Sequence, residues 1–254
     1  MSINLAAVDD ANRIAKEITE RSGGTPDILL LQEVIRRKGA QASVAEELAV
    51  KLRLHAAFAA PDAGATNVGV AILSRWPITN KNVKVVPRFY KLVKIRPRLA
   101  LGVTAHTPHG SIRVWTTHLD TRITVEERLR QLEPILSDAD AYRGPSIIGG
   151  DLNTLSLNWI LHSVPYPTGN AHARAVLQLM QRHGFETPFR EDRPTYDRFG
   201  LQLDWVYLRG LQATKSGIEP LAFSDHHAVW TEFVRNNSVP KAGLGSSVAR
   251  SRTY

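Results

Sequence analysis

The sequence of 254 residues contains no cysteine. A disulfide framework, a thiolate zinc site and a cysteine nucleophile are therefore excluded. The sequence also lacks any apolar run of the roughly 18–20 residues that a membrane-spanning helix needs, and its cleanest run, residues 28–31, has the size of a strand. The first ten residues have neither the basic start nor the long apolar stretch of a signal peptide. These absences fit either a cytoplasmic protein or the mature part of an exported one.

Acidic residues are absent from one long stretch of the chain. The formal net charge is +8, and residues 63–119 contain no Asp or Glu while they carry nine Lys and Arg residues. Within this stretch Lys94, Arg96 and Arg98 alternate with apolar residues, so an extended chain would present three cations on one face. Such a face is either ordinary solvated strand surface or a wall for phosphate groups. Net charge favours phosphate-rich partners but does not indicate a fold.

Four segments combine the apolar spacing of helices with helix-capping signals. Two of them begin with a capping box, in which Ser or Thr precedes Glu by three residues. The predicted helices cover residues 11–18 behind Asp9 and Asp10, the segment that follows Ser43 and Glu46, the segment that follows Thr124 and Glu127, and residues 173–180 before Gly184.

Seven apolar runs of strand length lie between these segments. They occupy residues 27–33, 68–74, 98–107, 111–119, 145–151, 203–210 and 227–234. The turn residues Pro108, His109 and Gly110 separate two of the runs, which predicts an antiparallel hairpin. No repeat and no Gly/Ser/Pro-rich linker divides the chain. We therefore predict one domain over residues 1–235, with helices outside mixed sheets, and a basic tail over residues 236–254.

Polar residues interrupt five of the strand patterns at their ends. A polar side chain at the end of a buried strand is rigidly mounted, although any single example is usually a solvated or structural residue. Hydrolysis of a phosphate ester needs a hard cation, a positioned water and donors for the phosphoryl oxygens. Oxygen-rich ligands without cysteine favour Mg²⁺ or Mn²⁺ over zinc. The five ends carry Gln32 and Glu33, His118, Asp151 and Asn153, Asp204, and Ser224 to His226.

The ordered series of these motifs resembles a known family. The segments PDILLLQEV, GVAILSRWPI, VWTTHLD, IIGGDLN, LDWVYLRGL and SDHHAVW follow the order and approximate spacing of the endonuclease/exonuclease/phosphatase superfamily, the deoxyribonuclease-like metal-dependent phosphoesterases. The resemblance covers about residues 3–234. It implies an α+β fold, a four-layer α/β/β/α sandwich of two mixed β-sheets flanked by helices. It also implies an enzyme that hydrolyses a phosphoester with Mg²⁺ or Mn²⁺.

The resemblance further implies roles for the residues that match the motifs. Glu33 matches the metal-binding glutamate, Asp225 a second metal ligand or imidazole-orienting carboxylate, and His226 the catalytic histidine of the SDH motif. Asp151 matches the aspartate that orients or deprotonates the attacking water, and Asn153 the amide that contacts the phosphate.

Three further matches complete the expected site. His118 matches a histidine that assists the phosphate oxygens or the leaving group, and Asp204 an aspartate that orients this histidine or supports the metal ligands. Asn4 stands 29 residues before Glu33 and matches an asparagine near the metal. Only three residues precede Asn4, so we expect a first strand that is short or cut from a longer protein. Thr195 and Tyr196 resemble a substrate-side element, with a packed tyrosine as the alternative.

The sequence leaves the substrate open. A phosphodiester in nucleic acid is favoured by the basic stretch, because contacts to phosphate are the sequence-independent part of such binding. A lipid or small phosphoester is the alternative, and the apolar residues 157–167 are either a loop beside the site or ordinary core. A catalytically silent binding module on the same fold is the third hypothesis. We expect a monomer without a transmembrane segment.

Overall fold

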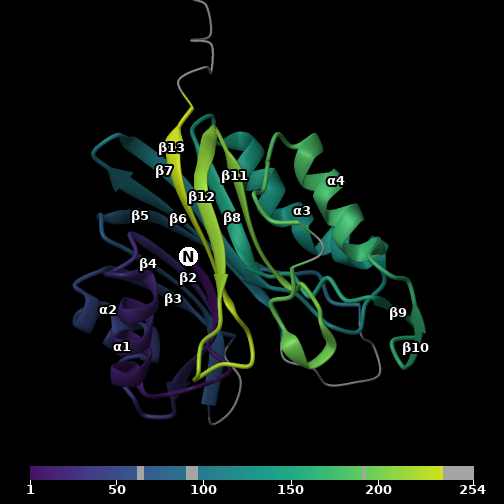
Figure 1. The fold of residues 1–254 in the computed structure, drawn as a ribbon, viewed down its shortest axis with the longest axis horizontal. Coiled ribbons are helices and arrows are strands. Elements are labelled where there is room, and N and C mark those ends of the chain that lie inside the picture. The colour runs from purple at the N-terminus through teal and green to yellow at the C-terminus, as the bar shows by residue number, and fades with distance from the viewer. Residues whose placement is uncertain (62–65, 90–96, 191–192, 237–254) are drawn as a thin grey trace, which may run out of the picture.

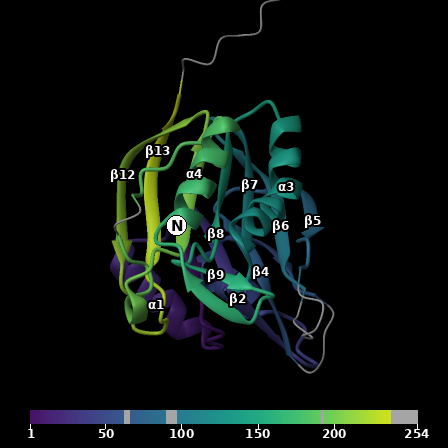
Figure 2. The same cartoon turned by 90° about the vertical axis from the view of Figure 1, so that its right-hand side faces the viewer.

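Two mixed β-sheets pack face to face, and each carries a pair of helices on its outer side (Figures 1 and 2). The computed structural model describes residues 1–61, 66–89, 97–190 and 193–236. Helices α1 (Ala11–Ser22) and α2 (Val44–Leu52) cover one sheet, and α3 (Val125–Ala141) and α4 (Ala171–Arg182) cover the other. This is the predicted four-layer α/β/β/α sandwich, which is confirmed. Among the described residues no helix has the length and apolarity needed to span a bilayer.

The first sheet has six strands in the order β12-β13-β1-β2-β4-β3. Only β1 and β2 run parallel, and the other neighbours are antiparallel. From edge to edge its strands are β12 (Leu211–Glu219), β13 (Ala228–Arg235), β1 (Ser2–Asn4), β2 (Ile28–Arg37), β4 (Thr66–Ser74) and β3 (His55–Ala59).

The second sheet has five strands in the order β11-β8-β7-β6-β5. Its parallel pair is β7 and β8, and the hairpin of β6 and β7 closes at the predicted turn. Its strands are β11 (Asp204–Arg209), β8 (Ser146–Asp151), β7 (Gly110–His118), β6 (Leu99–Thr107) and β5 (Ile78–Val85). A separate two-stranded hairpin consists of β9 (Leu157–Ile160) and β10 (Val164–Pro167), and the 3₁₀ helix η1 spans Asp197–Phe199.

Three of the four helices, α1, α2 and α3, begin where the capping residues predict. Asp10 accepts hydrogen bonds from the first backbone N–H groups of α1. Both capping boxes form, at Ser43 with Glu46 and at Thr124 with Glu127. These caps satisfy backbone donors that a helix otherwise leaves unpaired at its first turn.

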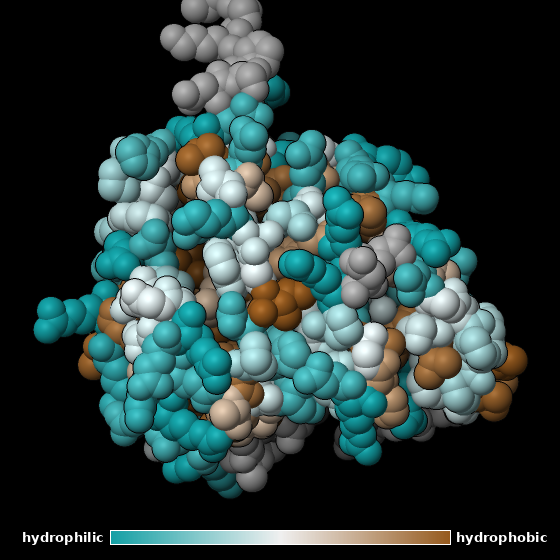
Figure 3. Space-filling model, in the orientation of Figure 1, coloured by the Kyte–Doolittle hydropathy of each residue, from teal (hydrophilic) through white to brown (hydrophobic). Residues whose placement is uncertain are grey.

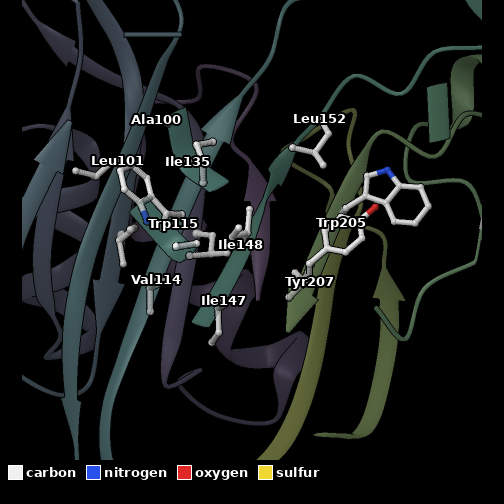
Figure 4. Packing of buried hydrophobic residues seen from close by; sticks show 14 of the residues in the cluster. Ala100, Leu101, Val114, Trp115, Ile135, Ile147, Ile148, Leu152, Trp205 and Tyr207 are labelled. Atoms are coloured by element: carbon white, nitrogen blue, oxygen red, sulfur yellow. The ribbon is translucent and has the colours of Figure 1, made fainter. Parts of the chain in front are cut away.

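Apolar side chains fill the space between the sheets and beneath each helix pair. In the larger core cluster Trp115 of β7 and Ile148 of β8 are fully buried, and Ile135 of α3 packs onto them from outside the sheet (Figure 4). A smaller cluster joins α1 and α2 to β2 through residues such as Ile14, Leu48 and Leu29. The cores hold the strands rigidly, so the side chains at the strand ends have fixed positions.

Candidate functional site

Strand register brings the predicted site residues of the second sheet together. In the parallel pair β7–β8, His118 lies opposite Asp151, and in the antiparallel pair β8–β11, Asp151 lies opposite Asp204. The end of β7, the end of β8 and the start of β11 therefore meet at one edge. Asn4, at the end of β1 in the facing sheet, reaches across and donates a hydrogen bond from Nδ2 to Asp151 Oδ2 at 3.1 Å.

Asp151 is the buried centre of this cluster. Its Oδ1 accepts the backbone N–H of Asn153 at 3.0 Å, and its Oδ2 lies 3.3 Å from Nε2 of His118. Burial and the neighbouring charge of Asp204 raise the pKa of Asp151 to about 7. A carboxyl group with this pKa exchanges a proton with water near neutral pH, as a general base must.

His118 is held neutral by its surroundings. Burial, followed by the charges of Arg98 and His226, lowers the pKa of His118 well below its usual value. Arg98 lies 3.1 Å from Nδ1, and because arginine only donates, Nδ1 accepts. The neutral ring then carries its proton on Nε2, which faces Asp151. His118 is thus a hydrogen-bond donor in this arrangement.

His226 is oriented by a buried carboxylate. Its Nδ1 lies 2.8 Å from Oδ2 of Asp204, which also accepts a hydrogen bond from Oγ1 of Thr195 at 2.7 Å. Burial lowers the pKa of His226, but the hydrogen bond and charge of Asp204, with the charges of Asp151 and Asp225, outweigh it and raise the pKa to about 9. The ring is therefore a cation near neutral pH, and its Nε2 lies 3.9 Å from Oδ2 of Asp151.

Glu33 approaches the cluster from β2 at a break in strand pairing. The register between β2 and β4 shifts between Leu31 and Val34, and Glu33 has a positive φ of 52°. Such a bulge redirects a side chain out of the regular alternation. Oε1 of Glu33 lies 3.9 Å from Nδ1 of His118, and one third of its side chain is exposed.

A cleft of about 360 Å³ opens beside these residues. Glu33, Arg98 and His118 line it together with backbone and apolar atoms of β4 and neighbouring loops. A larger cavity of about 1110 Å³ lies between the sheets at the opposite ends of the strands, next to Ile28, Ile147 and Leu208. Glu33 and His118 border the smaller cleft, and His118 contacts Asp151 of the buried cluster, so we assign the candidate site there.

The carboxylate oxygens at this edge fit a divalent cation. Possible ligand atoms of Asp151, Asp204 and His226 all lie within 4.8 Å of one another, but the cationic His226 has no free ring nitrogen to bind a metal, so the carboxylates are the ligands that remain. Oδ1 of Asp204 is buried and has no hydrogen-bond partner among the described residues. Carboxylate oxygens without thiolates are the ligands of hard cations such as Mg²⁺. Asp225 is exposed next to His226, and its pairing with Glu33 on one metal stays a prediction.

Three residues of the site make contacts that differ from what the sequence suggested. Asp204, expected to orient His118 or to support the metal ligands, lies opposite Asp151 in the β8–β11 pair and bonds His226. Thr195, expected to face the substrate, is fully buried and holds Asp204. Its neighbour Tyr196 packs on His226 with ring centroids 5.0 Å apart. Asn153, expected at the phosphate, donates from Nδ2 to the carbonyl oxygen of Leu119 at 2.9 Å.

Among its described residues, the basic stretch does not form one cationic wall. Arg113 is buried and bonds Asp138 through Nε at 2.8 Å, and Arg75 pairs with Asp27. Arg98 points into the site, where its contact with His118 was not anticipated. The remaining residues of the predicted face, Lys94 and Arg96, lie outside the described residues, as does Lys91 of the same basic stretch.

Comparison with known proteins identifies the family and the fold. The model of the Endonuclease/Exonuclease/phosphatase family matches residues 1–226. The chain belongs to this family. A UPF0294 protein of Vibrio vulnificus (strain YJ016) is 27% identical over 110 residues, which span 43% of this chain and 34% of that protein. The matched segment is thus about a third of the Vibrio protein's length.

Solved structures of the family share the fold. The endonuclease/exonuclease/phosphatase from Beutenbergia cavernae DSM 12333 superposes with a TM-score of 0.72 at 22% identity, covering 92% of this chain and 70% of that chain. ANGEL2, a 2′,3′-cyclic phosphatase solved with adenosine-2′,3′-vanadate, superposes with a TM-score of 0.57 at 16% identity. That superposition covers 89% of this chain and 78% of ANGEL2. At these identities the likeness concerns the fold.

Proposed function

We propose that this family member is a divalent-metal-dependent phosphodiesterase. The observation that carries the proposal is the buried group of Asp151, Asp204 and His226, in which a carboxyl of raised pKa stands beside an aspartate-oriented, cationic histidine. A base and an acid next to each other are what hydrolysis of an ester requires. The family membership and the phosphoester named for ANGEL2 support the same reaction class.

Each residue has a definite task in the proposed reaction. Asp151 takes a proton from the attacking water as the new P–O bond forms in line with the bond that breaks. His226 donates from Nε2 to the departing oxygen, and the neutral His118 donates from Nε2 to a phosphoryl oxygen. Bound Mg²⁺ or Mn²⁺, held by Glu33 and Asp225, would neutralise the charge that develops on the phosphoryl oxygens.

The substrate class is a separate question. The basic stretch favours a nucleic acid as substrate. Arg113 pairs with Asp138 and Arg75 with Asp27, so these two cations are already neutralised within the protein, which weakens that argument. A lipid phosphodiester gains support from the segment 157–167, which is an exposed hairpin rather than core.

Hydrolysis of bis(p-nitrophenyl) phosphate and p-nitrophenyl phosphate tests the reaction class. We expect cleavage of the diester with Mg²⁺ or Mn²⁺, abolished by EDTA and lowered about 10²–10⁴-fold in Asp151→Asn, the usual range for a lost general base. Asp140→Asn is the matched control, since Asp140 also bonds a histidine, His183, but on the surface. Cleavage of the monoester alone, or equal rates in the two variants, would contradict the proposal.

A further inference from the structure

The β9–β10 hairpin exposes an unusual concentration of apolar side chains. Ile160 is 56% exposed, Leu161 84%, Val164 58% and Tyr166 40%. These are four of the large apolar side chains that the described part of the chain presents to solvent, and they lie within seven residues of one another. Figure 3 shows brown, hydrophobic surface at the lower right of the molecule, over β9 and β10.

The same segment carries no formal charge. No Asp, Glu, Lys or Arg occurs from residue 152 to residue 173, although charged residues make up 22% of the chain. On the surface of a water-soluble protein, charged side chains are ordinarily interspersed among apolar ones, and they keep exposed apolar patches small. An uncharged hairpin with an apolar tip is therefore suited to an apolar environment.

The turn of the hairpin has a leucine at a position whose backbone conformation is less strained for Gly or Asn. Leu161 and His162 both have positive φ values, 48° and 58°, and the N–H of Ser163 donates to the carbonyl oxygen of Ile160 at 3.0 Å. Turns of this kind favour Asn or Gly at both central positions. The most exposed apolar side chain of the hairpin thus occupies a position that its backbone geometry disfavours.

One contact at its turn and one in β9 fix the hairpin in place. Nε2 of His162 lies 3.0 Å from the carboxylate of Glu127 in the first turn of α3. The guanidinium of Arg122 lies 5.4 Å from the ring of Trp159 in β9. β9 begins four residues after Asn153, and both views place the hairpin below α4 (Figures 1 and 2). The tip therefore has a fixed direction, close to the segment that follows β8.

The shape and chemistry of this surface fit a lipid bilayer better than a protein. A stable protein interface buries about 800 Å² on each partner, more than a narrow projecting tip offers. In membrane-bound proteins aliphatic side chains ordinarily lie in the acyl region, and aromatic rings and arginines lie nearer the headgroups. The hairpin has the same order, with aliphatic side chains at its tip and an aromatic ring and an arginine behind them. The net charge of +8 complements an anionic membrane surface.

We propose that the β9–β10 hairpin docks the protein on an anionic lipid bilayer by inserting Ile160, Leu161 and Val164. If the proposed phosphodiesterase activity holds, docking presents the catalytic edge to lipid headgroups, and the substrate is a phosphodiester carried by a lipid. The docking itself does not depend on that activity.

Sedimentation with lipid vesicles tests the docking. The probes are phosphatidylcholine vesicles with and without phosphatidylglycerol, and the variants are Leu161→Asp and Val50→Asp. Val50 is a matched control because it is 80% exposed but lies on α2, on the other side of the molecule (Figure 1). We expect Leu161→Asp to partition about tenfold or more weakly onto the phosphatidylglycerol vesicles, as loss of one inserted leucine predicts, and Val50→Asp to match the unaltered chain.

The alternatives give different results. Both variants keep the basic residues beyond position 236. Attraction of those residues to vesicles therefore cannot cause a difference in vesicle binding between the two variants. Absence of vesicle binding, or equal binding of the two variants, would overturn the proposal. A loss of affinity of Leu161→Asp for a single-stranded oligonucleotide, with vesicle binding unchanged, would assign the hairpin to nucleic acid instead. Hydrolysis of bis(p-nitrophenyl) phosphate by each variant shows separately whether the active centre is intact.

Discussion

At the scale of single residues, burial distinguishes two chemically identical pairs. His226 with Asp204 and His183 with Asp140 each join a ring nitrogen to a carboxylate at 2.7–2.8 Å. Asp204 is fully buried, whereas 46% of the Asp140 side chain is exposed. Because solvent screens charges at the surface, only the buried pair couples strongly to neighbouring groups such as Asp151.

Replacement of Asp204 by Asn tests this coupling. The hydrogen bond and charge of Asp204 oppose the effect of burial on His226, so the variant should lower the pKa of His226 from about 9. The same change should lower the pKa of Asp151 from about 7, since Asp204 contributes to raising it. Asp151, the base, then becomes a carboxylate at lower pH, and His226, the acid, loses its proton at lower pH. NMR titration of His226 in the metal-free protein, with the pH profile of hydrolysis, measures both shifts.

Asp140→Asn is the control for that titration, and it should leave the His226 titration where it is. An unchanged pKa of His226 in Asp204→Asn would mean that the Asp204 carboxylate does not determine the charge of the histidine.

The residue types and positions of the site were predictable, but their partners were not. His118 and Asp151 follow apolar runs and Asp204 stands at the start of one, so their place at strand ends could be predicted from the sequence. The hydrogen bonds of Asp204 with His226 and of Arg98 with His118 join residues 22 and 20 positions apart in the chain. Such contacts depend on sheet order and register, which local patterns do not specify.

At the scale of elements, three of the strands that sequence patterns missed share a position, whereas the missed strands β9 and β10 form a separate hairpin. β3, β5 and β12 are edge strands of the two large sheets. An edge strand is partly solvated, so its apolar alternation is weak, and β5 reads ITNKNVKV with most side chains exposed or half-buried. The inner strands β2, β6, β7 and β8 are buried and gave clear apolar runs. The helices were predicted because their caps are local.

Close approach of β7 and β8 depends on one glycine. Gly150 has a φ of 138°, and a Cβ there would lie 2.0 Å from the carbonyl oxygen of Thr117, next to His118. Gly150→Ala should therefore lower the free energy of unfolding by about 3 kcal/mol or more, from backbone strain and overpacking together. Urea denaturation measures the change.

Gly23→Ala is the control for the steric part of this effect. Gly23 also has a positive φ, 65°, but a Cβ there would have no atom within 4 Å. Gly23→Ala should lower the free energy of unfolding by only about 1–2 kcal/mol, the usual penalty for an alanine in the left-handed conformation. Equal destabilisation of the two variants would show that contact with Thr117 is not what requires glycine at position 150.

At the scale of the whole molecule, the two sheets contribute different parts of one site. The second sheet supplies His118, Asp151 and Asp204, while the first supplies Asn4 and Glu33. Only packing of the sheets face to face brings the two sets together, and the 3.1 Å hydrogen bond from Asn4 to Asp151 spans the interface. The site is therefore a property of the complete sandwich.

The position of Mn²⁺ in crystals of the protein, located by anomalous scattering, tests the central claim that this edge is a metal-dependent catalytic centre. We predict an ion bound by oxygen atoms of Glu33 and Asp225 at about 2–2.5 Å, beside Asp151 and His226, and absent from Glu33→Gln crystals. An ion held elsewhere, or carboxylates of Glu33 and Asp225 too far apart to share one ion, would contradict the account.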